Sequence, residues 1–421
     1  MRAKNSIRYY LLILLVLAFS FFTNDFGLID IQKTALVIAV GIDRENDEFI
    51  VTSQIALPKP DAQGEQNTEI VSKSKTVANA FEKINAKTGW YPKLVFCQLI
   101  ILGENAVQSN VFESLGFFLR NEYISDSCLL ATCQGSAQEL LNAKNPVENL
   151  SGLAIVKMLS SHAKEVGTVL PTTLREFSQR YYSEHKSGYL PVIKTEKPQE
   201  DTKQSKQKKG KTNGQVRDER KFFIVPTTSQ DNSSNSSQEK NGSQSGKSGA
   251  DEEKVFSASE TALFKNGSLV GKLTKEETLA LAFVKSKLRL AVYLIGNEGE
   301  EHTLSVRQNS PKTKLSLADK NQPRFEIKVT ATVAALDKNR ANTMEELEKS
   351  PEVPKNILQS AEEKLEKELF QLFKKTKALD CDVFDCVETL KRKEYDEYSK
   401  QKDTLLERIT PDVEVSFRTV R

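Results

Sequence analysis

Apolar and polar positions alternate in short blocks along most of the chain, and these blocks predict both strands and helices. Residues 34–43 (TALVIAVGID) and 48–57 (EFIVTSQIAL) are rich in residues that favour strands. The polar residues 44–47 (REND) between them are typical of a tight turn. The ordered part of the chain is therefore predicted to open with a β-hairpin.

The rest of the first half is predicted to alternate helices with strands. Val77, Phe81 and Ile84 share one face of a helix that ends at Gly89. A near-continuous apolar run follows, as expected for a strand covered on both faces, and this order predicts a mixed sheet with helices packed on it. We expect strands at 93–103, 126–135 and 188–193, and helices at 105–121, 150–166 and 173–185, the last capped by Thr172 or Thr173.

After residue 254 the local patterns predict an α+β region. Asn266-Gly267 separates two β-rich runs and predicts a hairpin, and Thr274 with Glu277 forms the capping box of the next helix. We expect strands at 301–308, 312–318, 323–337 and 412–420. A long amphipathic helix is predicted over 353–380, with an apolar stripe made of Leu358, Ala361, Leu365, Leu369, Leu372 and Phe373.

Composition separates these two regions. Residues 195–254 are rich in Ser, Asn, Gln, Gly and charged residues, and they hold too few apolar side chains to offset the entropy of ordering. We therefore expect a disordered insertion there. Its apolar island, residues 221–226 (KFFIVP), predicts either a strand that returns to the first domain or a partner-binding motif.

The predicted fold class is α+β, with two mixed α/β domains that have antiparallel or mixed sheets and are joined across the insertion. The predicted boundaries are 1–24 for a signal or membrane anchor, 25–194 for an N-terminal domain, 195–254 for the insertion and 255–421 for a C-terminal domain.

The amino terminus has the features of an export signal or an anchor. Basic residues precede an uncharged, mostly apolar run over 9–22, which at ~1.5 Å per residue spans ~21 Å, less than the ~30 Å of a bilayer core. Ala18-Phe19-Ser20 fits a cleavage site, but Phe21 and Phe22 extend the apolar run, so cleavage and an uncleaved anchor both stay open. Either one places the body outside the cytoplasm. The predicted anchor residues are Arg2, Lys4, Arg8, Leu11, Leu12, Ile13, Leu14, Leu15, Val16, Leu17, Phe19, Phe21 and Phe22.

The net charge of the chain and the positions of its histidines exclude several classes of function. A formal net charge of +3 supplies no strong field, so no nucleic-acid partner is expected. His162, His185 and His302 belong to no catalytic or metal-binding pattern. We therefore predict no catalytic site, no cofactor, no metal and no enzymatic activity.

The cysteines are predicted to be buried core residues. Cys128 and Cys133, and again Cys381 and Cys386, are separated by four residues, which does not fit the spacing of a zinc site. A Cys381–Cys386 disulfide or a longer-range one stays open outside the cytoplasm. Small buried hydrophobes are the favoured interpretation.

Several segments carry, in order, a resemblance to a known family. They are ALVIAVGID at 35–43 with the hairpin after it, LIILGENA at 99–106, ESLGFFLRNEYI at 113–124, TALFKNGSLVGKLTKEET at 261–278 and DVFDCVETLKRKEYDE with ITPDVEVSFRTV towards the carboxyl end. Each segment alone has a structural explanation as a strand, turn or cap. Together they resemble the Ger(x)C family, the C subunits of bacterial spore germinant receptors.

The resemblance implies a mixed α/β protein without enzymatic activity, on the outer face of the spore's inner membrane. The implied partners are the membrane and the membrane-embedded A and B subunits of the receptor. An alternative hypothesis is an anchored extracytoplasmic solute-binding protein that captures a small nutrient directly. Trp90, in a predicted loop, is then a candidate to line the pocket, although packing over its own domain is the commoner role of such a residue. The motif residues for which we expect structural roles are Gly41, Asp43, Gly103, Arg120, Asn266, Gly267 and Gly271.

The chain departs from the family pattern in two places. Family members carry a lipobox cysteine shortly before the first strand, whereas this chain has Asn24-Asp25-Phe26 there and no cysteine before Cys97. We therefore do not carry lipidation over to this chain, and an uncleaved helix around Leu11 to Phe22 is one way in which the lipid could be replaced. Asp385-Cys386 stands where the family tends towards glycine.

Overall fold

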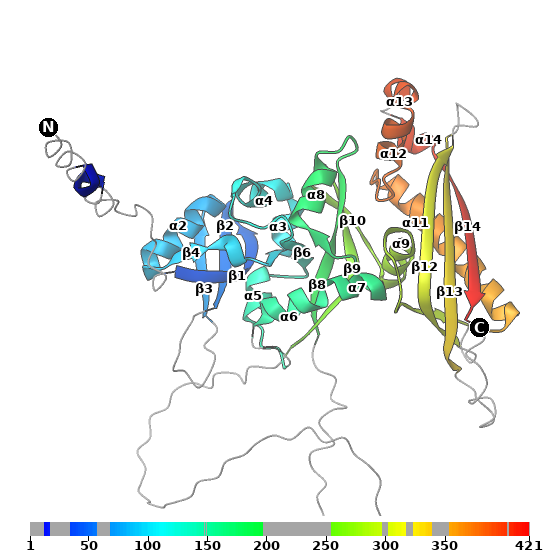
Figure 1. Ribbon diagram of the computed structural model, residues 1–421, viewed down its shortest axis with the longest axis horizontal. Helices are drawn as coiled ribbons and strands as arrows, with labels where there is room; N and C mark the ends of the chain where they lie inside the picture. The colour runs from blue at the N-terminus through cyan, green and yellow to red at the C-terminus, as the bar shows by residue number, and fades with distance from the viewer. Residues whose placement is uncertain are drawn as a thin grey trace, which may run out of the picture.

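The computed structural model of the protein describes residues 12–16, 34–56, 68–146, 148, 150–196, 254–296, 302–316, 323–338, 353–401 and 404–420. Within these ranges the chain forms two β-sheets with helices packed on them, and the sheets follow one another along the long axis of the molecule (Figure 1). The fold is therefore the predicted α+β class.

Strands and helices of the first part alternate, as predicted. Its strands are β1 (Thr34–Glu45), β2 (Glu48–Ala56), β3 (Thr68–Ser74), β4 (Tyr91–Lys93), β5 (Leu99–Leu102), β6 (Leu129–Cys133), β7 (Thr172–Thr173) and β8 (Ser187–Glu196). Its helices are α2 (Val77–Thr88), the 3₁₀ helix η2 (Leu94–Phe96), α3 (Glu104–Gln108), α4 (Val111–Arg120), α5 (Ala137–Asn142), α6 (Ser151–Met158), α7 (Ser161–Val166) and α8 (Leu174–Tyr181).

The second part begins with a hairpin and ends with a strand. Its strands are β9 (Val255–Lys265), β10 (Ser268–Leu273), β11 (Val292–Ile295), β12 (His302–Ser316), β13 (Arg324–Lys338) and β14 (Thr410–Thr419). Its helices are α9 (Lys275–Lys285), α11 (Lys355–Ala378), α12 (Cys386–Lys393), α13 (Tyr395–Gln401) and α14 (Leu405–Arg408).

The first sheet has the strand order β10-β9-β8-β6-β5-β1-β2-β3, with β4 paired to β1 and β7 to β6. Strands β1, β5, β6 and β8 run parallel, and the outer pairs are antiparallel hairpins. β9 pairs with β8 from Glu196↔Val255 to Ser187↔Lys265. The first sheet therefore takes strands from both sides of residues 197–253, and the second sheet starts at β11.

Local sequence explains the hairpins and caps that hold this sheet. Asn46 and Asp47 both have positive φ, 47° and 63°, as the turn between β1 and β2 requires. Asn266 and Gly267 do the same between β9 and β10, with φ of 52° and 81°. The predicted hairpins and the Thr274–Glu277 capping box are confirmed, and Thr173 is the residue that caps α8.

Helices cover both faces of the first sheet. One face packs against α2, α4 and α8 through residues such as Phe81, Leu115 and Phe177. The other packs against α5, α6 and α7 through residues such as Leu141 and Ile155. The central strand β5 is fully buried from Leu99 to Leu102, which explains its uninterrupted apolar sequence.

The second sheet has the order β11-β12-β13-β14, with β14 parallel to β13. Helix α11 buries the predicted stripe against this sheet, although Leu358 is only partly buried. On the outer edge of β14, Glu366 and Glu362 accept hydrogen bonds from the backbone N–H groups of Val415 and Phe417, at 3.0 and 2.6 Å. These carboxylates occupy an edge that would otherwise be open to another strand.

Both sheets contribute to one continuous core. Tyr189 of β8, Leu263 of β9 and Leu273 of β10 belong to the same buried cluster as Phe325 of β13 and Phe373 of α11. Helix α9 lies between the two sheets and contributes Leu281 and its neighbours (Figure 1). How the chain divides into independently folding domains at residue 255 stays a prediction, but the two sheets are joined by buried side chains.

Some predicted elements are wrong in detail. The helix expected over 105–121 is two helices, because the side chain of Asn110 caps α4 by accepting from Phe112 N at 3.0 Å. The strand expected over 93–103 begins with η2 and narrows to β5, and the two strands expected over 301–318 form one strand, β12, with a bulge near Val306. Strands β3 and β11 and helix α5 were not predicted. The expected insertion, including residues 221–226, lies outside the described residues apart from its ends.

Candidate functional site

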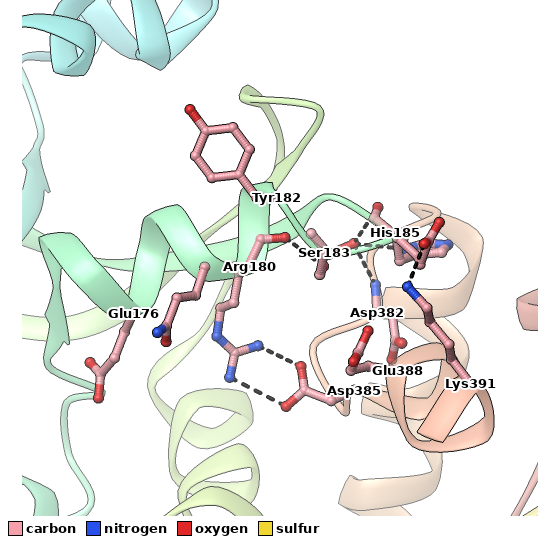
Figure 2. Close-up of a pocket in the computed structure, with 12 residues that line it drawn as sticks. Glu176, Arg180, Tyr182, Ser183, His185, Asp382, Asp385, Glu388 and Lys391 are labelled. Atoms are coloured by element: carbon pink, nitrogen blue, oxygen red, sulfur yellow. Dashed lines mark hydrogen bonds and ion pairs between the residues drawn. The ribbon is translucent and has the colours of Figure 1, made fainter. Parts of the chain in front are cut away.

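A polar pocket of about 490 Å³ lies where α8 and the start of β8 meet the segment before α12 (Figure 2). Its two sides are about 200 residues apart in sequence, as in the pair Arg180–Asp385. The pocket is thus a junction between the first sheet and the helices that follow α11. It is lined by Glu176, Gln179, Arg180, Tyr182, Ser183, Glu184, His185, Ser187, Asp382, Asp385, Glu388 and Lys391.

Asp385 is the electrostatic centre of the junction. Its carboxylate accepts from Arg180 Nη1 at 2.7 Å and Nη2 at 3.4 Å (Figure 2). It also accepts from Lys285 Nζ at 2.6 Å. Burial alone would raise the pKa of Asp385, but Lys285 and Arg180 more than offset that effect and hold the pKa below its usual value. One carboxylate therefore connects α8, α9 and α12.

The conformation of Asp385 explains why glycine suits this position. Its φ is 61°, in the left-handed region that glycine adopts without a side-chain penalty. Aspartate tolerates this region better than most residues. In this chain the backbone of Asp385 keeps some strain, but its side chain forms two ion pairs that glycine could not form.

Asp382 has a structural role beside it. This buried carboxylate accepts from the N–H groups of Cys386, at 3.0 Å, and Val387, at 2.8 Å, and so caps the start of α12. Its own N–H donates to Ser187 Oγ at 2.9 Å. Asp382 therefore fixes α12 against β8.

His185, Ser187 and Asp380 have a superficial likeness to a hydrolytic triad. His185 Nδ1 lies 2.8 Å from Ser187 Oγ, and its Nε2 lies 3.1 Å from Asp380. Burial and the cation of Lys265, 3.0 Å from the ring, lower the pKa of His185 and favour the neutral ring at pH 7. However, Ser187 is only 4% exposed and its hydroxyl already accepts from Asp382 N, so it is not placed to attack a substrate.

The pocket as a whole is suited to fixing surfaces rather than to chemistry. Arg180 and Lys285 are both paired with Asp385, and a further pair joins Lys391 to Glu184 at 2.5 Å. Among the described residues, no group of three or more His, Cys, Asp and Glu side chains is placed to hold a metal ion. Sequence reasoning missed this junction, because Arg180, Lys285 and Asp385 show no relation along the chain.

The motif residues Gly41, Asp43 and Gly103 come together elsewhere, at the start of α5. Asp43 accepts from Ser136 Oγ at 2.9 Å and from the N–H groups of Ala137 and Gln138, at 2.8 and 2.9 Å. A Cβ on Gly103 would lie 1.9 Å from Asp43 Oδ1, and one on Gly41 would lie 3.1 Å from Ala137 Cβ. These three residues allow one buried carboxylate to hold α5 against the sheet.

The remaining motif residues lie along β10 and α4. A Cβ on Gly267 would lie 2.3 Å from Asn110 Oδ1, and Gly267 O accepts from Val111 N at 2.9 Å. The Asn266-Gly267 turn therefore contacts and positions the start of α4. Gly271 faces Leu379 at the end of α11, where a Cβ would approach to 2.7 Å. Arg120 is exposed in the last turn of α4.

Only part of the predicted anchor belongs to the described residues. Residues 12–16 form a helical segment whose large side chains are exposed by 57–69%. In the part of the chain that the structure describes, no helix has both the length and the hydropathy to cross a membrane. Arg2, Lys4, Arg8, Leu11, Leu17, Phe19, Phe21 and Phe22 lie outside it.

The five cysteines are buried, as predicted, and each is a free thiol. Burial, strengthened by nearby carboxylates such as Asp43 for Cys133, raises the pKa of the thiols of Cys133 and Cys386. These side chains therefore behave as small apolar residues. Trp90 is partly buried against the core of its own sheet and does not line the pocket.

Comparison with known families gives two matches in sequence order. Residues 28–195 match a family described as the spore germination protein N-terminal domain, and residues 259–419 match one described as spore germination B3/GerAC like, C-terminal. The chain belongs to the Ger(x)C family. The comparison with curated proteins found no match.

A solved structure shares the fold of this Ger(x)C protein. The crystal structure of the GerBC protein superposes with a TM-score of 0.51 at 18% sequence identity, over 91% of this chain and 97% of that one. At this identity the likeness concerns the fold. The family expectation made from the ordered segments is confirmed by the two family matches, and the predicted α+β fold class agrees with the fold that the two structures share.

Proposed function

We propose that this Ger(x)C protein is the non-catalytic, membrane-tethered C subunit of a spore germinant receptor. It acts with membrane-embedded A and B subunits on the outer face of the spore's inner membrane, in triggering germination by nutrients. The observation that carries the proposal is the pair of family matches, which together span most of the chain in the order that the family has. The apolar run over 9–22, preceded by three basic residues, supports a peptide anchor that holds the protein at the membrane in place of a lipid.

The site geometry favours a bracing role over nutrient capture or catalysis. The polar pocket has its central charges paired internally, and its serine is buried. In the proposed arrangement, the buried cluster that joins β8, β9 and β10 to the second sheet lets the two sheets act as one stiff body that braces the membrane subunits. In this proposal the stiff body couples nutrient binding in the membrane subunits to the opening of an ion path.

Deleting the gene in the spore-forming host tests the proposal. We expect the mutant spores to lose at least about tenfold in the rate of response to the nutrients of this receptor, because a receptor without one of its subunits does not assemble. The response to nutrients read by other receptors of the same spores is the control and should be unchanged. An unimpaired response to every nutrient would contradict the proposed function, whereas full complementation by the intact gene would support it.

A further inference from the structure

Large apolar and aromatic side chains are exposed together at one end of the first sheet. They are Tyr91 of β4, Val95 and Phe96 of η2, and Tyr123 after α4, exposed by 47%, 51%, 52% and 65%. Lys93 Nζ lies 6.0 Å from the centre of the Tyr123 ring and so joins β4 to the loop after α4. We call these four residues the entry patch.

The topology of the sheet places the entry patch beside the point where the chain enters from its amino-terminal segment. Strands β1, β5 and β6 are parallel, so their first residues, Thr34, Leu99 and Leu129, lie at the same edge. Tyr91 pairs directly with Thr34, and Gln98 O accepts from Leu129 N at 2.8 Å. The patch therefore lies around the amino-terminal ends of β1, β5 and β6.

The opposite end of these strands carries charged side chains instead of exposed aromatic ones. The turn after β1 holds Asp47, whose side chain is 98% exposed, and Arg44, which pairs with Glu113 at 2.5 Å. Lys73 pairs with Glu45 close by, at 2.9 Å. Charged side chains thus cover the end of the sheet where β1 finishes, and the exposed aromatic side chains lie at the end where β1 begins.

We propose that the entry patch rests in the interface of the lipid bilayer and so fixes the orientation of the protein on the membrane. This inference depends on the proposed tether, because residues 23–33 can separate the apolar run from Thr34 by at most roughly 40 Å when fully extended. Tyrosine, phenylalanine and a neighbouring lysine are the side chains that favour the headgroup level of a bilayer. The membrane subunits are the competing occupant of this surface.

The nearby acids determine which kind of membrane contact the patch can make. Glu122 and Asp126 flank Tyr123 and are exposed, and Asp126 pairs with Arg175 at 3.2 Å. An attraction to anionic lipids is therefore not the driving force. The contact rests on burial of apolar area, so it should persist in zwitterionic lipid and change little with salt.

Fluorescence quenching in vesicles tests the inference with the full-length protein. Val95→Cys carries an environment-sensitive fluorophore, and Asp47→Cys, at the charged edge, is the matched control; the native cysteines are buried, which limits background labelling. The labelled proteins are reconstituted into phosphatidylcholine vesicles with and without acyl-brominated lipid. Vesicle flotation first measures the tether separately.

We expect brominated lipid to lower the emission of the label at position 95 at least about twofold and to leave the label at position 47 nearly unchanged, at low and high salt. Adding Phe96→Asp to the position 95 variant should abolish the quenching while the protein still floats. Floating protein with no difference between the two labels overturns the entry patch and leaves the tether intact. Quenching that is lost when the A and B subunits are added assigns the patch to those subunits and also overturns the inference. Failure to float overturns both the tether and the patch.

Discussion

We expect Gly103→Ala to lower the free energy of unfolding by about 3–5 kcal/mol. The added Cβ would lie 1.9 Å from Asp43 Oδ1, a carboxylate that three hydrogen bonds hold in place, whereas the approach to Ala137 N, at 3.3 Å, needs only a small shift. Asp43 would have to withdraw from Ser136, Ala137 and Gln138, and α5 would lose the three hydrogen bonds that hold its start against the sheet. The measurement is the urea midpoint of the purified full-length protein, followed by circular dichroism.

Two further variants separate this mechanism from a general intolerance of alanine. Gly116→Ala, within α4, would meet only the flexible guanidinium of Arg120 at 3.3 Å, and we expect it to be neutral or to stabilise by up to about 1 kcal/mol. In an Asp43→Ala background, where the carboxylate is absent, Gly103→Ala should cost little beyond the first substitution. Additive losses in the double variant would contradict the proposed contact.

Asp385→Asn is expected to destabilise the protein by about 1–3 kcal/mol at pH 7, a range reduced for the partial solvent exposure of the carboxylate. The side chains of Arg180 and Lys285 are only 20% and 16% exposed, and they would lose their shared counter-charge. Because the folded-state pKa of Asp385 is held low, its contribution is full above the ordinary aspartate pKa of about 4. The difference between the native protein and Asp385→Asn should therefore shrink as pH falls below that value and disappear once pH has passed below the lower folded-state pKa of Asp385.

The matched control for this prediction is Asp126→Asn. Asp126 also pairs with an arginine, Arg175, at 3.2 Å, but the two side chains are 75% and 61% exposed. Loss of such an exposed pair should cost no more than about 0.5 kcal/mol. Equal losses for the two variants at pH 7, or a loss for Asp385→Asn that does not depend on pH, would show that the junction is not held by this charge.

Elements that depend on local signals were predicted well. The turns at Asn46-Asp47 and Asn266-Gly267, the Thr274–Glu277 box and the Gly89 end of α2 each follow from the conformations that these residues favour. The ordered run of such segments was also sufficient to indicate the family.

Elements that depend on distant partners were not predictable in this way. β11 has only four residues, and pairing with β12 defines it as a strand. The addition of the β9–β10 hairpin to the first sheet depends on its register with β8, across residues 197–253. Likewise, the importance of Asp385 follows from Arg180 and Lys285, which lie 205 and 100 residues away in sequence.

The central claim is that this protein works as a subunit of a membrane receptor, and co-purification tests it most directly. A carboxy-terminally tagged copy would be isolated from detergent-solubilised spore membranes, with an unrelated tagged membrane protein as the control. We predict that the A and B subunits of one receptor co-purify with the chain and are absent from the control. Recovery of folded, membrane-derived chain without either subunit would contradict the account.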